Sequence, residues 1–164
     1  MATDPNAPLP NANLRAARYY IARTCVACPH CGISTLLCAL ALGSGHEARD
    51  DELGDWQAVQ ANAFCFYIAA VSRAVYRRLR RKAPNFKFAS SDDAAESHWL
   101  NHCQHCDLVI ADDEIHGEPG MHGFVLCNEA HAANIDLIEI NEPFEALAGG
   151  YSVEPEFFAF MRRA

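Results

Sequence analysis

The sequence is poor in positive charge, with 13 Lys and Arg residues against 21 Asp and Glu residues and a formal net charge of −8. This balance excludes a protein that coats nucleic acid through its overall charge. No apolar run approaches the roughly 18–20 residues that a membrane-spanning helix needs. The N-terminal stretch MATDPNAPLPNANLRAARYY has no signal-peptide pattern of a charged segment followed by an apolar one. We therefore expect a cytoplasmic protein with no membrane partner.

The 164 residues are enough for one domain with a hydrophobic core, and an apolar content of 51% excludes a disordered chain. Residues 1–13 are rich in Pro, Asn and Ala and lack periodicity, so we expect a flexible leader there. We expect a single zinc-ribbon-like domain over residues 14–152. A C-terminal helix is predicted over 153–164, with Ser152 as its N-cap, acidic residues in its first turn and arginines in its last.

The eight cysteines are too few for a secreted disulfide scaffold, so in a reducing compartment they indicate metal ligands or redox thiols. Two C-x-x-C pairs stand out, in CPHCG and in HCQHCD. A spacer of two residues lets one tight turn present two sulfurs to one ion, and structural zinc takes four such ligands in a tetrahedron. We predict one structural Zn²⁺ bound by Cys28, Cys31, Cys103 and Cys106.

The 71 residues between the two pairs exceed the ~15–20 of a compact zinc ribbon, so the prediction requires an insertion between two hairpins. The entropic cost of closing such a loop grows only logarithmically with its length. Cys25 offers a shifted pair with Cys28, but Gly32 directly after Cys31 favours the Cys28/Cys31 turn. Replacement of a ligand, or a second ion, remains open for Cys25, His30, His102 and His105.

A redox role for the C-x-x-C pairs is less favoured, because strand-like segments rather than the start of an amphipathic helix flank each pair. The cysteines at positions 38, 65 and 127 lie in the apolar stretches LLCALAL, AFCFYIA and FVLCN. We interpret Cys38, Cys65 and Cys127 as small buried hydrophobic residues.

The fold class predicted is α+β, with zinc-ribbon-like β-hairpins, a long inserted amphipathic helix and a short C-terminal helix. Residues 18–23, 34–42 and 98–110 are strand-like around the two cysteine turns. The long helix is predicted at about 57–82, because apolar residues recur there at helical spacing before Pro84. These apolar residues are Phe64, Ile68, Val71, Val75 and Leu79.

Positive charge is concentrated at the end of this predicted helix, where residues 73–87 hold seven of the thirteen basic residues and no acidic one. Such a stripe is either a solvated helix face or a docking face for an acidic partner. The acidic remainder of the chain favours a protein partner or self-association over nucleic acid. The candidate partner-binding residues are Arg73, Arg77, Arg80, Arg81 and Lys82.

The segment 112–122 collects carboxylates and two histidines and would serve a hydrolytic enzyme through His116, Glu118 and His122. No H-E-x-x-H motif or nucleophile elbow accompanies it, and a zinc ion held by four cysteines has no open position for water. The sequence therefore favours a zinc-stabilised protein-interaction or regulatory module. A nucleic-acid-binding zinc ribbon and a hydrolase are the alternatives.

The stretches YYIAR, CPHCGISTLLCALAL, HWLNHCQHC, HGEPG and EPFEALAGGYS resemble a group of small bacterial proteins of uncharacterised function with zinc-ribbon-like CxxCG and NHCxHC knuckles. The resemblance spans about residues 18–152. It implies that Cys28/Cys31 and Cys103/Cys106 form the knuckles and that Trp99 is the tryptophan before the second one. It implies no particular activity.

Overall fold

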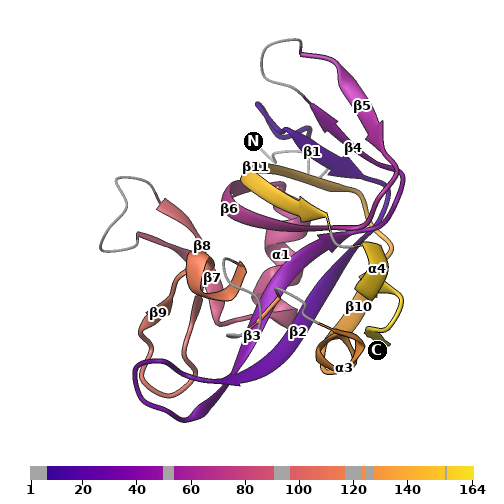
Figure 1. Cartoon of the computed structure of the whole chain (residues 1–164). Coiled ribbons are helices and arrows are strands. Elements are labelled where there is room, and N and C mark those ends of the chain that lie inside the picture. The colour runs from indigo at the N-terminus through magenta and orange to yellow at the C-terminus, as the bar shows by residue number, and fades with distance from the viewer. Residues whose placement is uncertain (1–6, 50–53, 91–96, 117–122, 125–127, 154) are drawn as a thin grey trace.

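A computed structural model describes residues 7–49, 54–90, 97–116, 123–124, 128–153 and 155–164. The described residues are mainly β-strands, in one sheet of nine strands and one of three (Figure 1). The large sheet has the order β12-β10-β2-β3-β6-β11-β1-β4-β5, and the small sheet has the order β7-β8-β9. All pairings in the two sheets are antiparallel except that of β10 with β12.

The large sheet is built from β1 (Leu14–Ala16), β2 (Tyr19–Ala27), β3 (Ser34–Leu42), β4 (His46–Arg49), β5 (Trp56–Val59), β6 (Ala63–Val71), β10 (Asp136–Ile140), β11 (Phe144–Val153) and β12 (Arg162–Arg163). The small sheet consists of β7 (Phe86–Ser90), β8 (Ser97–His102) and β9 (Val109–Ile110). Four short helices accompany them in the described residues: α1 (Arg73–Lys82), α2 (Asp112–His116), α3 (Glu129–Ala132) and α4 (Pro155–Phe158).

Both faces of the central strands are buried, which explains the continuous apolar run STLLCALAL in β3. Leu40 of β3 belongs to a hydrophobic cluster that also includes Val75 and Leu79 of α1. The neighbouring residue Ala39 belongs to a second cluster on the opposite face, together with Phe158 of α4. Because side chains alternate along a strand, a strand covered on both faces has apolar residues at every position.

The predicted α+β fold with a long helix at about 57–82 is wrong. The first part of that range contains the strands β5 and β6, and the helix begins only at Arg73. Ser72 is its N-cap and accepts a hydrogen bond from the Val75 N–H at 3.4 Å. The segment AFCFYIAAV is rich in aromatic and β-branched residues, which favour a strand over a helix.

Irregularities in β6 imitate the spacing of a helix. Tyr67 has a left-handed φ of 51°, and Ile68 pairs with Ala148 while Ala70 pairs with Leu147, which leaves one extra residue in β6. Side-chain alternation is therefore interrupted, as expected at a β-bulge. Cys65 and Ile68, which lie on either side of the left-handed Tyr67, both belong to the cluster that contains Leu40 although they are three residues apart. Phe64, the first residue of the supposed helical stripe, belongs to the opposite cluster.

The C-terminal helix expected over 153–164 is much shorter, because α4 spans only Pro155–Phe158. Ser152, the supposed cap, lies within β11. After α4 the chain forms β12, which pairs in parallel with β10 so that Arg162 lies opposite Asp136. The carboxylate of Asp136 accepts from the Arg162 guanidinium at 2.8 Å, which favours this strand pairing.

Part of the expected leader contacts the sheet. The side-chain amide of Asn13 donates to the Ala148 carbonyl at 2.7 Å and accepts from the Ala148 N–H at 2.9 Å. The Leu9 N–H donates to the Glu145 carboxylate at 2.8 Å. These hydrogen bonds hold residues 9–13 against β11.

Candidate metal centre

Four cysteine sulfurs converge where the β2–β3 turn meets the β8–β9 turn. The Sγ atoms of Cys28, Cys31, Cys103 and Cys106 all lie within 4.8 Å of one another. The separation is 3.8 Å between Cys28 and Cys106 and 3.7 Å between Cys31 and Cys103. A tetrahedral zinc ion with Zn–S bonds of 2.3 Å places its sulfurs about 3.8 Å apart. The sequence-predicted cysteines therefore come together with the spacing that one tetrahedral ion requires, and they can hold a metal.

The two cysteine turns have the same backbone hydrogen bonds. The N–H of Cys28 donates to the Ile33 carbonyl at 2.9 Å, and the N–H of Cys103 donates to the Leu108 carbonyl at 3.0 Å. Both bonds join a cysteine to the carbonyl five residues later. This turn brings the second cysteine of each pair back beside the first, which is why the C-x-x-C spacing supplies two ligands from one loop.

Each turn also directs a backbone N–H at its first sulfur. The His30 N–H points to the Cys28 Sγ at 3.4 Å, and the His105 N–H points to the Cys103 Sγ at 3.3 Å. Such donors stabilise a thiolate, which is the form that binds metal.

A left-handed residue follows the second cysteine in both turns. Gly32 has a φ of 74° and Asp107 has a φ of 59°. Glycine adopts this conformation without strain, and Asp tolerates it better than most residues. The second turn therefore lacks the glycine that marks the first in the sequence, although the two backbones match.

The two histidines inside the turns connect the hairpins instead of joining the sulfur cluster. The ring Nε2 of His30 lies 2.9 Å from the Val109 carbonyl oxygen, and the ring Nε2 of His105 lies 3.1 Å from the Ser34 carbonyl oxygen. With a proton on Nε2, each ring donates to the opposite hairpin. This reciprocal arrangement fixes one turn against the other.

The other residues considered as substitute ligands lie outside the cluster of four sulfurs. The ring Nδ1 of His102 is 3.0 Å from the Leu100 carbonyl oxygen, and the residue is buried. Cys25 is an exposed residue of β2.

The thiols affect one another's ionisation. Backbone N–H groups of Cys106 and His105, together with the neighbouring thiols, lower the pKa of Cys103 to about 6. Although a backbone hydrogen bond at Leu108 lowers the pKa of Cys106, burial and the three neighbouring thiols raise it to about 11. A first thiolate therefore disfavours further thiolates, and a cation within the cluster removes that repulsion.

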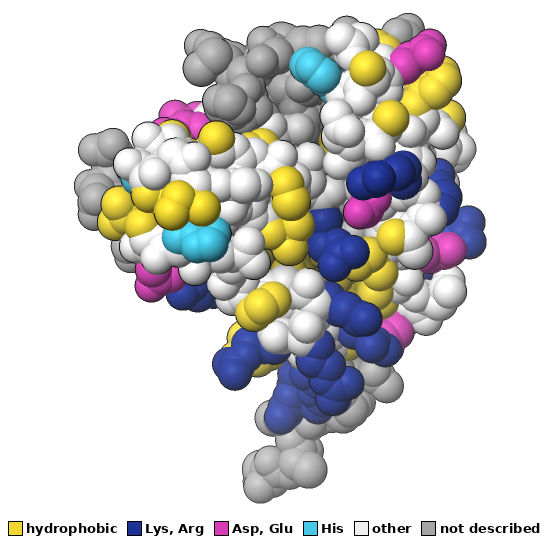
Figure 2. All heavy atoms as spheres, turned by 90° about the horizontal axis from the view of Figure 1, so that it is seen from below, with side chains coloured by type: hydrophobic (Ala, Val, Ile, Leu, Met, Phe, Trp, Pro, Cys, Tyr) yellow, Lys and Arg dark blue, Asp and Glu magenta, His cyan; other side chains and the backbone are white. Residues whose placement is uncertain are grey.

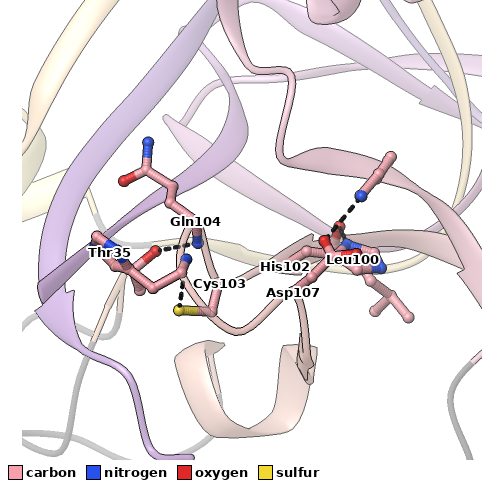
Figure 3. Close-up of polar contacts among 8 residues, drawn as sticks. Thr35, Leu100, His102, Cys103, Gln104 and Asp107 are labelled. Atoms are coloured by element: carbon pink, nitrogen blue, oxygen red, sulfur yellow. Dashed lines mark hydrogen bonds and ion pairs between the residues drawn. The ribbon is translucent and has the colours of Figure 1, made fainter. Parts of the chain in front are cut away.

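Residues beside the cysteines attach the second turn to β3. The backbone N–H of Gln104 donates to the Thr35 hydroxyl at 2.9 Å (Figure 3), and the Gln104 side-chain oxygen accepts from the Leu36 N–H at 3.0 Å. The side-chain amide of Asn101 forms a pair of hydrogen bonds with the backbone of Cys38. Asn101 is the first residue of the NHCxHC stretch, but its partner is 63 residues away, so the motif does not indicate this contact.

The basic residues predicted for partner binding lie on α1. Val75 and Leu79 bury the opposite side of this helix. Arg78, which was not among the predicted residues, donates to the Glu142 carboxylate. Figure 2 shows Lys and Arg side chains gathered on the underside of the molecule, beside hydrophobic side chains. The exposed residues, called the cationic face below, are Arg73, Arg77, Arg80, Arg81 and Lys82.

Exposed aromatic rings adjoin the cationic face. Tyr76 of α1 and Phe88 of β7 are 42% and 54% exposed, and the rings of both contact the buried Trp99 edge-on, with centroids 5.8 Å and 6.4 Å away. The Arg80 guanidinium donates to the Tyr76 hydroxyl at 3.1 Å. This surface therefore combines cations with accessible aromatic rings.

The segment proposed for a hydrolase is only partly described, since Glu118 and His122 lie outside the described residues. His116 packs among the rings of Phe64, Phe66 and Phe124, and burial lowers its pKa to about 4. The lowered pKa leaves the imidazole neutral at pH 7, and its ring stacks on that of Phe124.

The interpretation of the isolated cysteines as core residues is confirmed for Cys38 and Cys65. They are 4% and 2% exposed, and burial raises the pKa of each thiol to about 12. Cys127 lies outside the described residues.

No protein-family model, curated protein or solved structure matches this chain. In the described residues, every helix is too short or too polar to cross a membrane.

Proposed function

We propose that the protein is an interaction module whose two cysteine turns are held together by a structural zinc ion and whose cationic face binds an acidic segment of a protein partner. The four thiolates fill a tetrahedral shell, so the ion supplies stability and has no open position for a substrate. This assignment rests on the convergence of the four sulfurs. Zinc is preferred over redox-active ions because thiolate tetrahedra are typical of its structural sites.

The exposed charge on α1 carries the proposal for binding. The predicted partner-binding residues are exposed on a helix whose other side is anchored by Val75 and Leu79. Glu142 pairs with Arg78 beside this face, and Arg81 further lowers the pKa of the Glu142 carboxyl. The region therefore has more cationic groups than this carboxylate can neutralise, and arginine forks suit carboxylates of a partner.

A second candidate is single-stranded nucleic acid, and the observation that favours it is the exposure of Tyr76 and Phe88. Aromatic rings beside arginines can stack on unpaired bases while the cations contact phosphates. The protein partner is preferred because the remaining surface is strongly acidic and repels a long polyanion. Self-association through acidic surfaces of a second copy is the third arrangement that the same charges allow.

Fluorescence anisotropy with the zinc-loaded full chain tests the proposal. A labelled poly-glutamate peptide and a labelled oligo(dT) serve as probes, each titrated at several salt concentrations. We expect salt-dependent peptide binding that Arg77→Glu weakens by about tenfold. Arg49→Glu, the same charge change on β4, should leave the affinity within about twofold.

Tighter binding of oligo(dT) than of the peptide, lost in Arg77→Glu, would assign the cationic face to nucleic acid. A concentration-dependent molecular mass in sedimentation that Arg77→Glu abolishes would assign it to a second copy. Failure of both probes, in a chain that stays monomeric, would overturn the proposal for the cationic face. It would leave the zinc centre to be judged by metal analysis.

A further inference from the structure

A cavity of about 390 Å³ lies away from both the cysteine cluster and the cationic face. Its walls come from the β1–β2 connection, the β3–β4 turn and the segment from α4 to β12. Figure 1 shows α4 close to the place where the chain passes from β3 to β4. This volume is in the range of pockets that hold small organic ligands.

The charge of the cavity is opposite to that of the whole chain. Arg18, Arg163 and His46 line it, whereas none of its lining residues is Asp or Glu. The chain as a whole has a net charge of −8. Basic groups concentrated in a concave site attract anions, because the low-dielectric walls focus the potential.

Arg163 is held in place by aromatic rings. Its guanidinium carbon lies 5.0 Å from the ring centroid of Tyr20 and 5.2 Å from that of Phe158. The two rings also meet each other edge-on, with centroids 5.6 Å apart. Cation–π contacts restrict the orientation of the guanidinium without using its N–H groups. Among the described residues no carboxylate pairs with Arg163, so its N–H fork remains available to an oxyanion.

Two further polar groups in the wall have unused capacity. The ring Nδ1 of His46 is 2.9 Å from the Gly43 carbonyl oxygen, and its buried Nε2 has no partner among the described residues. The Ser44 N–H is used by the Asn62 side chain at 3.0 Å, while the Ser44 hydroxyl has only a 3.5 Å contact with Gln60. Buried polar groups are normally paired, so the unpaired Nε2 of His46 beside a cavity indicates a missing partner. Ser44 is exposed, and its hydroxyl can turn toward a molecule in the cavity.

From these observations we propose that this cavity binds a small organic anion, with a carboxylate or phosphate group paired to the Arg163 guanidinium and the rest of the ligand against Tyr20. Arg18, whose other contact is the Glu139 carboxylate at 3.2 Å, supplies a second cation at the cavity mouth. The Ser44 hydroxyl donates to the bound oxyanion. This proposal is independent of the zinc centre and of the cationic face.

The test is a ¹H–¹⁵N NMR titration of the zinc-loaded full chain with sodium phosphate and, separately, with sodium acetate. Sodium chloride at matched ionic strength is the reference. We expect saturable shifts at residues 16–18, 43–46 and 158–163 with at least one of the two probes and none with chloride. The probe that binds more tightly distinguishes a phosphate site from a carboxylate site.

Three variants separate a site from general charge attraction. Arg163→Gln is expected to weaken binding about tenfold, and Arg18→Gln by a smaller factor, since charge-assisted bidentate contacts are the stronger ones. Arg162→Gln is the matched control, because Arg162 is next to Arg163 in the chain but does not line the cavity. Its guanidinium pairs with the Asp136 carboxylate. Arg18 is exposed, so its variant tests the site even if Arg163→Gln perturbs the aromatic packing. The absence of saturable shifts with both probes, or equal weakening by Arg162→Gln and Arg18→Gln, would overturn the proposal.

Discussion

The side chain of Asn101 pairs with the backbone of Cys38 as a neighbouring strand would. Its Oδ1 accepts from the Cys38 N–H at 2.8 Å, and its Nδ2 donates to the Cys38 carbonyl at 2.9 Å. Asn101 is fully buried, and this contact joins β8 of the small sheet to β3 of the large one.

Asn101→Ala should therefore lower the free energy of unfolding by about 2–4 kcal/mol, because two buried backbone groups lose their partners. Urea unfolding followed by the fluorescence of the nearby buried Trp99 measures the change. Gln57→Ala, at an exposed position of β5, is the control and should stay within about 0.5 kcal/mol of the wild type. An Asn101→Ala variant as stable as that control would show that the contact contributes nothing.

The four-cysteine centre predicts one zinc ion per chain and a strong dependence of stability on it. Cys103→Ser removes one of four converging sulfurs, so the variant should bind metal poorly and melt at a lower temperature. Cys25→Ser is the matched control, because Cys25 is exposed and its sulfur lies outside the cluster. Metal content by atomic emission and thermal unfolding with and without EDTA are the measurements. Loss of zinc in Cys25→Ser, or its retention in Cys103→Ser, would contradict the assignment.

Gly123 is expected to be far less replaceable than Gly54, although both have a left-handed φ, of 86° and 66°. A Cβ on Gly123 would lie 2.8 Å from the Ile115 carbonyl oxygen, whereas a Cβ on Gly54 would meet nothing within 4 Å. Gly54→Ala should cost about 1 kcal/mol from backbone conformation alone. Gly123→Ala should cost about 1–3 kcal/mol more, because backbone must move. Equal losses in urea unfolding would show that the Ile115 contact relaxes without cost.

Asp112 should make stability fall as pH rises. Burial raises the pKa of its carboxyl to about 6, while the Tyr67 N–H, donating at 2.7 Å, partly opposes this. The folded state thus holds the proton more tightly than the unfolded state, so this stabilisation is complete below about pH 4 and is lost as pH rises through 6.

Asp112→Asn keeps an oxygen acceptor for the Tyr67 N–H and removes the titration. The stability advantage of this variant over the wild type should increase by about 1 kcal/mol between pH 5 and pH 8. Urea unfolding at the two pH values measures it, and the metal-linked pH dependence cancels because both proteins share it. Asp113→Asn, at an exposed neighbouring position, should show no such increase. A pH-independent difference for Asp112→Asn would mean that Asp112 has an ordinary pKa.

The cysteine centre could be predicted from the sequence because its determinants are local. Each C-x-x-C turn is set by hydrogen bonds within six residues, from Cys28 to Ile33 and from Cys103 to Leu108. The strand-like run 34–42 likewise corresponds to β3. The contacts that bring the two turns together, such as Asn101 with Cys38, join residues far apart and leave no periodic pattern.

The sequence wrongly predicts a long helix because a bulged strand and a helix have the same spacing of apolar residues in this chain. Ile68 and Val71 of β6 and Val75 of α1 are three and four residues apart and pack on the same cluster. The left-handed conformation of Tyr67 distinguishes the bulged strand from a helix. Tyr67 lies opposite Gly149, where a Cβ would be 3.0 Å from the Tyr67 Cβ. The need for a glycine opposite Tyr67 becomes apparent only from the pairing of β6 with β11.

The position of Asn101, two residues before Cys103, bears on how strongly the centre can bind. By fixing β8 to β3, the amide confines both thiol-bearing loops to one small volume through protein contacts alone. A metal ion could then form four bonds to the preorganised sulfurs without the entropic cost of ordering the long segment between the two turns. The affinity of the cluster for a metal ion would therefore depend partly on an amide that does not touch the ion.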